Sequence, residues 1–137
     1  MTKQKIVPRQ FYVNHVKKAE EFYAEMEDSF QRDHWNTCVS NAVLTIISIV
    51  DAIAIQQLGK KSGSESHVES YLLMDEIRTS DEHRKSNLKY EIIELIKMKT
   101  PSQYEERLMS KGDAEKATNR CKKIYSFLLD EIKKREI

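Results

Sequence analysis

The hydrophobic residues are most concentrated in residues 34–58, the most apolar stretch of a chain in which 33% of the residues are charged. Apolar positions in this stretch do not alternate but recur at about 100° per residue, which indicates a helix rather than a strand. One broad face of that helix carries Trp35, Val39, Ala42, Val43, Ile46, Ile47, Val50, Ile53, Ala54 and Leu58. The pattern predicts a central helix whose wide face lies in the core.

The opposite side of this predicted helix is a polar track, formed by Asn41, Thr45, Ser48, Asp51 and Gln56. Leu44 and Ile55 interrupt the track. A solvated face is one interpretation, and a face turned toward a second subunit or a ligand is the other. Two aliphatic side chains favour the second, so we expect Leu44 and Ile55 at a homodimer interface. A carboxylate near the centre of the run argues against a membrane span.

Similar apolar stripes predict helices over residues 8–31, 66–77 and 110–135. A further helix is expected between the break at 79–82 and Pro101, with its stripe at Leu88, Ile92, Leu95 and Ile96 and a longer connection from 100 to 110 after it. Expected boundaries are Asp33 as N-cap of the central helix, Gly59 after its end, and capping boxes at Ser66–Glu69, Thr79–Glu82 and Ser110–Asp113. We therefore expect an all-α fold: an up-and-down antiparallel four-helix bundle with one additional short helix. Residues 1–137 would form one domain, with its core at about 10–132.

The composition narrows the function only modestly. The charge is balanced, with 23 Lys and Arg against 22 Asp and Glu, so the net charge of the chain does not indicate nucleic-acid binding. Cys38 and Cys121 lie on apolar faces and are expected to be buried free thiols in a reducing compartment. The first residues carry no apolar segment of the signal-peptide kind, so we expect a cytoplasmic protein that does not engage a membrane.

Few residues suggest chemistry. None of the four histidines has Glu or Asp three positions before it, and no familiar metal or phosphate motif is present, so no metal or cofactor is expected. Arg78 and His83 are separated by four residues at a helix junction. There His83 could move a proton at an RNA 2′-hydroxyl while Arg78 stabilised the phosphate. A charged loop also produces this spacing by chance, and both interpretations stay open.

A family resemblance adds to this picture. It is carried by Asn41-Ala-Val, Asp51-Ala-Ile, Leu58-Gly, Ser66-His67, Leu95-Ile-Lys97-Met-Lys99, Gln103-Tyr104 and Asp113-Ala114. Together with the apolar last helix, these segments resemble HEPN-domain proteins over roughly residues 10–132. The resemblance implies an α-helical bundle that is usually a homodimer. Such domains occur as RNases of toxin–antitoxin and defence systems, and others are non-catalytic partners of nucleotidyltransferases.

Active members of that family carry Arg, then four to six residues, then His, near the start of the last long helix. In this chain the corresponding register falls at Lys99-Thr-Pro-Ser-Gln-Tyr104, where Lys99 stands for Arg and Tyr104 for His. Lysine keeps the positive charge but not the bidentate fork, and tyrosine, which titrates near about 10, is a poor base at neutral pH. Arg78 and His83 keep the spacing but lie one helix too early.

The resemblance also implies that Asn41 and Asp51 line the same dimer cleft. Lys97 and Lys99 could hold a phosphate there, and Tyr104 could stack on a base. The first hypothesis is a non-catalytic homodimeric module that binds RNA, a nucleotide or a nucleotidyltransferase-like protein. The alternative is a metal-independent endoribonuclease that uses Lys99 and Tyr104, or Arg78 and His83.

Overall fold

The chain forms a helical bundle, seen here in a computed structural model that describes residues 4–63 and 68–136. Its helices are α1 (Tyr12–Gln31), α2 (Trp35–Leu58), α3 (Val68–Leu73), α4 (Glu82–Ile96), α5 (Lys99–Gln103) and α6 (Lys111–Lys134). A 3-10 turn, η1 (Arg9–Phe11), precedes α1, and two short strands, β1 (Gln4–Ile6) and β2 (Lys60–Ser62), pair antiparallel. The predicted all-α fold class is confirmed. The small β-sheet and α5 were not predicted.

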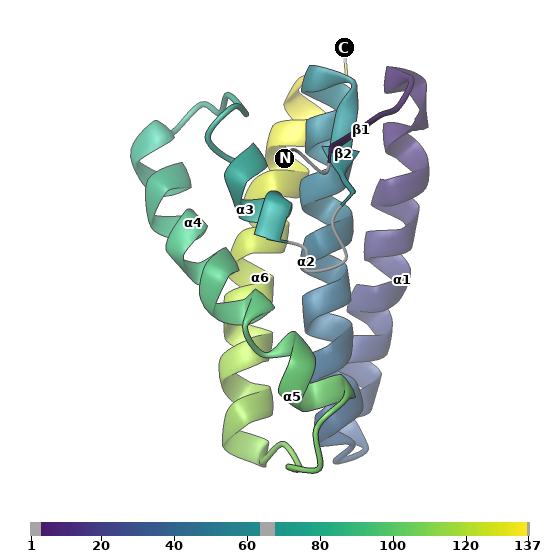
Figure 1. Cartoon of the computed structure of the whole chain (residues 1–137), viewed down its shortest axis with the longest axis vertical. Coiled ribbons are helices and arrows are strands. Elements are labelled where there is room, and N and C mark those ends of the chain that lie inside the picture. Colours follow the sequence, from purple (N-terminus) through teal and green to yellow (C-terminus); the bar gives the residue numbers. More distant parts are fainter. Residues whose placement is uncertain (1–3, 64–67, 137) are drawn as a thin grey trace.

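Helix α2 forms the centre of the core. It lies between α1 and α6 (Figure 1), and it also touches η1, β2, α3 and α5. Its fully buried apolar side chains are Cys38, Val39, Ala42, Val43, Ile46, Ile49, Val50, Ala52, Ile53, Ala54 and Ile55. By length and composition α2 passes as a membrane span, but 83% of the apolar window is buried inside the chain. A core helix of a folded domain has this property.

The polar track of α2 is not the open face that the helical pattern suggests. Thr45, Ser48 and Asp51 are all buried, and so is Ile55, whose side chain is completely inaccessible. Leu44 is half-buried. The expectation that Ile55 lies on an exposed surface is therefore wrong. The physical reason is that α2 contacts short elements besides α1 and α6, among them η1, β2 and α5, and none of these shows in the hydrophobic pattern.

The turn between α1 and α2 differs from the expected one. Asp33 has a positive φ of 59°, and the N-cap of α2 is His34, so the prediction of Asp33 as N-cap is wrong. The amide of His34 donates to the carbonyl of Ser29 (2.9 Å), which closes the end of α1. Aspartate tolerates this left-handed conformation better than most residues, and it thus terminates one helix rather than starting the next.

Two of the expected helix boundaries are confirmed. At the start of α6, Ser110 Oγ accepts from the amide of Asp113 (3.1 Å), and a carboxylate oxygen of Asp113 accepts from the amide of Ser110 (2.9 Å). This is the predicted capping box. At the end of α2, Gly59 has φ 69°, the left-handed value that glycine adopts at no steric cost.

The start of α4 is shifted from the expected position. Its N-cap is Asp81, whose carboxylate accepts from the amide of Arg84 (3.0 Å). Thr79 instead donates through its amide (2.9 Å) and hydroxyl (3.0 Å) to Glu82, which ties down the loop before the helix. The third expected box, at residues 66–69, lies largely outside the described residues.

Candidate functional site

A shallow open groove lies between the first half of α2 and α5. It has a volume of about 360 Å³ and is lined by Asn36, Thr37, Ser40, Asn41, Ser102, Gln103 and Tyr104. Helix α5 follows α4 almost directly, and Pro101 is accepted because it falls in the first turn, where its missing N–H is not needed. Most of the side chains that line the groove carry hydroxyl or amide groups, and the groove is open to solvent. Such groups can donate to and accept from a polar ligand.

Of the two residues of the family register, Tyr104 lines this groove and Lys99 contacts Tyr104. Lys99 Nζ lies 5.7 Å from the centroid of the Tyr104 ring, a cation–π arrangement. The Tyr104 side chain is 70% exposed. A positive charge beside an open aromatic face can take a phosphate and a stacked base together.

Asn41 and Asp51 do not share a cleft. Asn41 lines the groove, whereas Asp51 lies ten residues further along α2, or about 15 Å along a helix. The Asp51 carboxylate is only 5% exposed and accepts from the amide (3.1 Å) and the hydroxyl (3.0 Å) of Ser62. The expectation of one site containing both residues is therefore wrong. Asp51 fastens β2 to α2 instead of contacting a ligand.

The electrostatics around Asp51 are those of a buried structural group. Burial raises the pKa of Asp51 to about 6, although the bonds from Ser62 and the charges of Lys61 and Lys18 act in the opposite direction. His15 lies near the same two lysines. Burial, followed by the repulsion from Lys61 and Lys18, lowers the pKa of His15 to about 4. This region therefore combines a carboxyl group that resists ionisation with an imidazole that resists protonation.

Lys97 stands just outside the groove. Its side chain is 69% exposed, and its Nζ is 3.1 Å from a carboxylate oxygen of Glu94 on the preceding turn. An exposed pair of this kind is weak, so Lys97 can leave Glu94 for a stronger anion. Lys97 can contribute to the potential near α5, but the groove wall itself does not include it.

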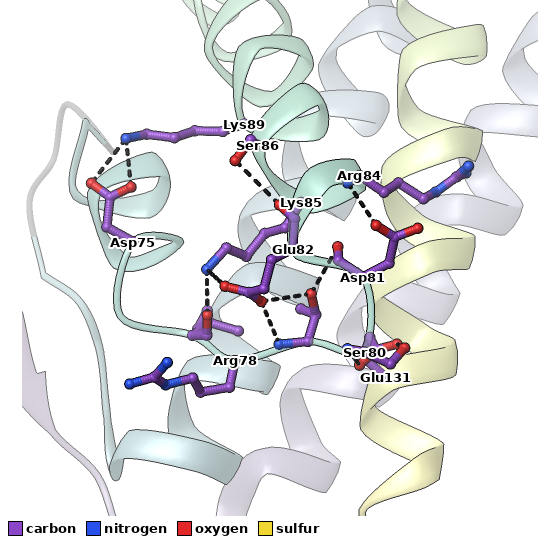
Figure 2. Close-up of polar contacts among 12 residues, drawn as sticks. Asp75, Arg78, Ser80, Asp81, Glu82, Arg84, Lys85, Ser86, Lys89 and Glu131 are labelled. Carbon is purple, nitrogen blue, oxygen red and sulfur yellow. Dashed lines mark hydrogen bonds and ion pairs between the residues drawn. The ribbon is translucent and has the colours of Figure 1, made fainter.

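Arg78 lies elsewhere, at the junction of α3 and α4 (Figure 2). His83 lies near it in sequence, in the first turn of α4. The backbone of Arg78 pairs with the side-chain amide of Gln57: its N–H donates to Oε1 (2.8 Å), and its carbonyl accepts from Nε2 (2.8 Å). Both Arg78 and His83 are exposed. In the described part of the chain, no hydrogen bond or ion pair joins them. The two residues therefore have the spacing of the family motif in the sequence, but their side chains do not form a catalytic pair in the structure.

The loop carrying Arg78 is held by a buried carboxylate that sequence reasoning missed. Glu131 of α6 accepts from the amide (2.9 Å) and the hydroxyl (2.6 Å) of Ser80, and Lys134 lies 3.0 Å from it. Burial acts to raise the pKa of Glu131, but the bonds from Ser80 and Lys134 bring it below its ordinary value. The available signal was a glutamate between Leu128 and Ile132 on the apolar face of α6.

A buried lysine completes this junction. Lys85 Nζ donates to the carbonyl of Ile77 (2.7 Å) and lies 2.9 Å from a carboxylate oxygen of Glu82.

The two candidate pairs, Arg78 with His83 and Lys99 with Tyr104, lie at opposite ends of α4, which runs from this junction to α5 (Figure 1). A helix of this length spans about 22 Å. Within one chain they cannot form one site.

Neither metal nor thiol chemistry has an obvious place in this arrangement. Among residues 4–63 and 68–136, no three His, Cys, Asp or Glu side chains come together as metal ligands. Cys38 and Cys121 are free and fully buried, as expected. Burial raises the pKa of Cys121 to about 12 and also raises that of Cys38. A buried thiol that resists ionisation is a poor nucleophile.

The fold and this groove define an all-α bundle with a polar groove between its central helix α2 and the short helix α5. The family model of the HEPN domain matches residues 12–133, nearly the whole bundle. The chain therefore belongs to the HEPN domain family, as its motifs indicated. Neither the comparison with curated proteins nor the one with solved structures gave a match.

Proposed function

We propose that this HEPN domain is a non-catalytic homodimeric module that binds single-stranded RNA or a nucleotide at the groove between α2 and α5. One observation carries the proposal. Tyr104, which lines the groove, and Lys99, the other residue at the family register, lie together with a separation of 5.7 Å between Nζ and the ring centroid. The amide and hydroxyl groups of the groove wall are suited to the polar edge of a base.

The same residues argue against catalysis. RNA cleavage needs a group that takes a proton near neutral pH and a donor that stabilises charge on the phosphate. Lysine and tyrosine supply charge and a stacking surface instead. A nucleotidyltransferase-like partner and a role in a toxin–antitoxin or defence system belong to the same proposal, and family membership alone supports them.

The test is binding of a labelled single-stranded RNA in the presence of EDTA, titrated in salt. Replacing Lys99 by Ala should weaken binding several-fold and flatten its salt dependence, because one phosphate contact is lost. Tyr104→Ala should weaken binding through lost stacking, and Tyr104→Phe should preserve it. Lys116→Ala on the exposed side of α6 is the matched control, since it removes the same charge away from the groove.

The opposing outcomes are equally definite. No RNA or nucleotide binding at low salt would end the proposal of an anion site. Cleavage of the RNA in EDTA would establish the alternative, a metal-independent endoribonuclease. Loss of that cleavage in Tyr104→Phe would place the activity in the groove, whereas loss in His83→Ala would place it at the α3–α4 junction.

A further inference from the structure

A second groove lies between α4 and α6, away from the proposed RNA site. It has a volume of about 640 Å³ and is lined by Arg84, Ser86, Asn87, Leu88, Tyr90, Glu91 and Lys123. Helix α4 crosses α6 obliquely (Figure 1). The residues that line this channel come from α4, apart from Lys123 of α6. The family register contributes no residue to this surface.

Arg84 lines the channel, and its guanidinium packs against an aromatic ring. Its guanidinium carbon lies 5.5 Å from the centroid of the Phe127 ring on α6, and its side chain extends from α4 toward α6 (Figure 2). Among the described residues no carboxylate is bonded to this guanidinium. Stacking on an aromatic ring fixes the plane of the guanidinium at low entropic cost. The N–H groups of the guanidinium stay available for a carboxylate of another molecule.

The channel is basic but not uniformly so. Glu91 accepts from Arg120 (2.8 Å), and its other oxygen lies 3.6 Å from Lys123 Nζ. Among the residues that line the channel, Arg84 and Lys123 are cationic and Glu91 is anionic, while Arg120, which pairs with Glu91, is not part of the lining. The surface therefore attracts negative charge, while Glu91 in its lining would repel a continuous chain of phosphates. This arrangement favours a partner with separated carboxylates over a nucleic acid.

Apolar groups complete the channel. Leu88 lines the channel and is 4% exposed, and Phe127, which is 9% exposed, lies beneath the Arg84 guanidinium. Tyr90 is 59% exposed, which leaves most of a large ring without contacts in the single chain. Arginine and tyrosine are the residue types most enriched where binding energy concentrates in protein interfaces. A trough between two helices is also the shape that receives a third helix.

We propose that the channel between α4 and α6 binds an acidic amphipathic helix of a partner protein. Carboxylates of that helix pair with Arg84 and Lys123, and its apolar stripe covers Tyr90. The site does not depend on the RNA groove. A loss of RNA binding would leave it intact, and its own failure would leave the RNA groove unaffected.

The probe is a fluorescein-labelled amphipathic peptide of about five helical turns, with a Leu and Phe stripe flanked by Glu. The comparison peptide has Gln at every Glu position. We expect anisotropy to show tighter binding of the Glu peptide, with the difference shrinking as salt rises. Arg84→Gln should weaken the Glu peptide by about tenfold, and Tyr90→Ala should weaken both peptides.

Two adjacent lysines provide a matched control. Lys123 lines the channel, whereas Lys122 lines a separate groove between α1 and α6, and both side chains are at least half exposed. Lys123→Gln should weaken the Glu peptide, and Lys122→Gln should not. Equal effects of the two variants, or equal binding of the Glu and Gln peptides, would overturn the proposal.

Other occupants would also be revealed. In one such outcome, Arg84→Gln weakens the binding of labelled single-stranded RNA and leaves the binding of the Glu peptide unchanged. That result would assign the channel to nucleic acid and overturn the proposal. Self-association of the protein that Arg84→Gln abolishes would assign it to a second copy of the chain. Circular dichroism of each variant establishes that the fold is retained.

Discussion

Asp51 of α2 holds Ser62 of β2 by two hydrogen bonds to one carboxylate oxygen, at 3.1 Å from the amide and 3.0 Å from the hydroxyl. Because β2 pairs with β1, this contact connects the β-sheet to the central helix. The Asp51 carboxylate is buried in this arrangement. Burial raises the pKa of Asp51 to about 6, which means that the folded state favours its protonated form.

The first prediction concerns Asp51→Asn. A group whose pKa is raised on folding stabilises the protein at low pH, and this stability is lost as pH rises from its ordinary value of 3.8 through about 6. Asparagine keeps the accepting oxygen without the charge. The variant should therefore match the parent near pH 4 and exceed it by about 1–3 kcal/mol at pH 7.5.

Urea unfolding across this pH range provides the measurement. His15 titrates in an overlapping range with the opposite sign, because its pKa is lowered to about 4. Subtracting the parent from the variant at each pH removes that contribution. Asp130→Asn, at an exposed position of α6, is the control. A variant less stable than the parent at pH 7.5 would show that ionised Asp51 is favoured in the fold.

The second prediction concerns the anchor of the α3–α4 junction. Glu131 is 4% exposed and accepts two bonds from Ser80. Glu131→Ala removes both hydrogen bonds between Ser80 and a charged carboxylate, and we expect a loss of about 2–3 kcal/mol in the free energy of unfolding. Amide hydrogen exchange should also become faster across residues 78–84.

Its neighbour Asp130 offers the comparison. Asp130→Ala changes an exposed carboxylate on the same helix, and we expect a change within about 0.5 kcal/mol. Equal costs for Glu131→Ala and Asp130→Ala would mean that the contact with Ser80 contributes nothing to stability.

The third prediction concerns the thiols. Cys38 and Cys121 are both completely buried, and burial raises the pKa of each. A thiol reagent should therefore label neither residue in native protein at neutral pH, and both after unfolding in urea. Absorbance of the released reagent measures the rate. Native labelling as fast as that of unfolded protein would show that these thiols are open to solvent.

The fourth prediction separates the two aliphatic residues of the polar track. Leu44 is half-buried, whereas Ile55 is completely buried. If the chain is a homodimer that uses this face of α2, Leu44→Glu should split it with little loss of helix. Ile55→Glu should instead unfold the protein, because it places an unpaired charge in the interior.

Light scattering and circular dichroism provide the measurements. A mass near 16.1 kDa for the unmutated protein at micromolar concentration would contradict the homodimer. Unfolding by Leu44→Glu would mean that Leu44 packs within its own chain instead of at an interface.

How far the sequence could predict this protein depended on the length of each pattern. Four long helices could be predicted because an apolar stripe repeats over several turns in each. The capping box at Ser110 and Asp113 was equally legible, since both bonds form within four residues. Helix α5 and the β-sheet could not be predicted, because a few residues give no periodicity to recognise.

The candidate site shows the same division. Lys99 and Tyr104 could be selected from their place in the family register, and they lie close together because both belong to one short segment. Asn41 reaches the same groove only because α5 packs against α2. Arg84, Phe127 and Glu131 escaped notice because each acquires its significance from a helix distant in sequence.

The sequence by itself determined the helical class, the central place of α2 and the membership of the HEPN family, since these rest on local periodicity and short motifs. Only the tertiary structure decided that Ile55 is covered, that Asp51 supports β2 and that Arg84 is stacked above Phe127. Burial and pairing across elements depend on how helices cross. A helical pattern identifies the apolar face of each helix, but it does not identify the elements that cover the opposite face.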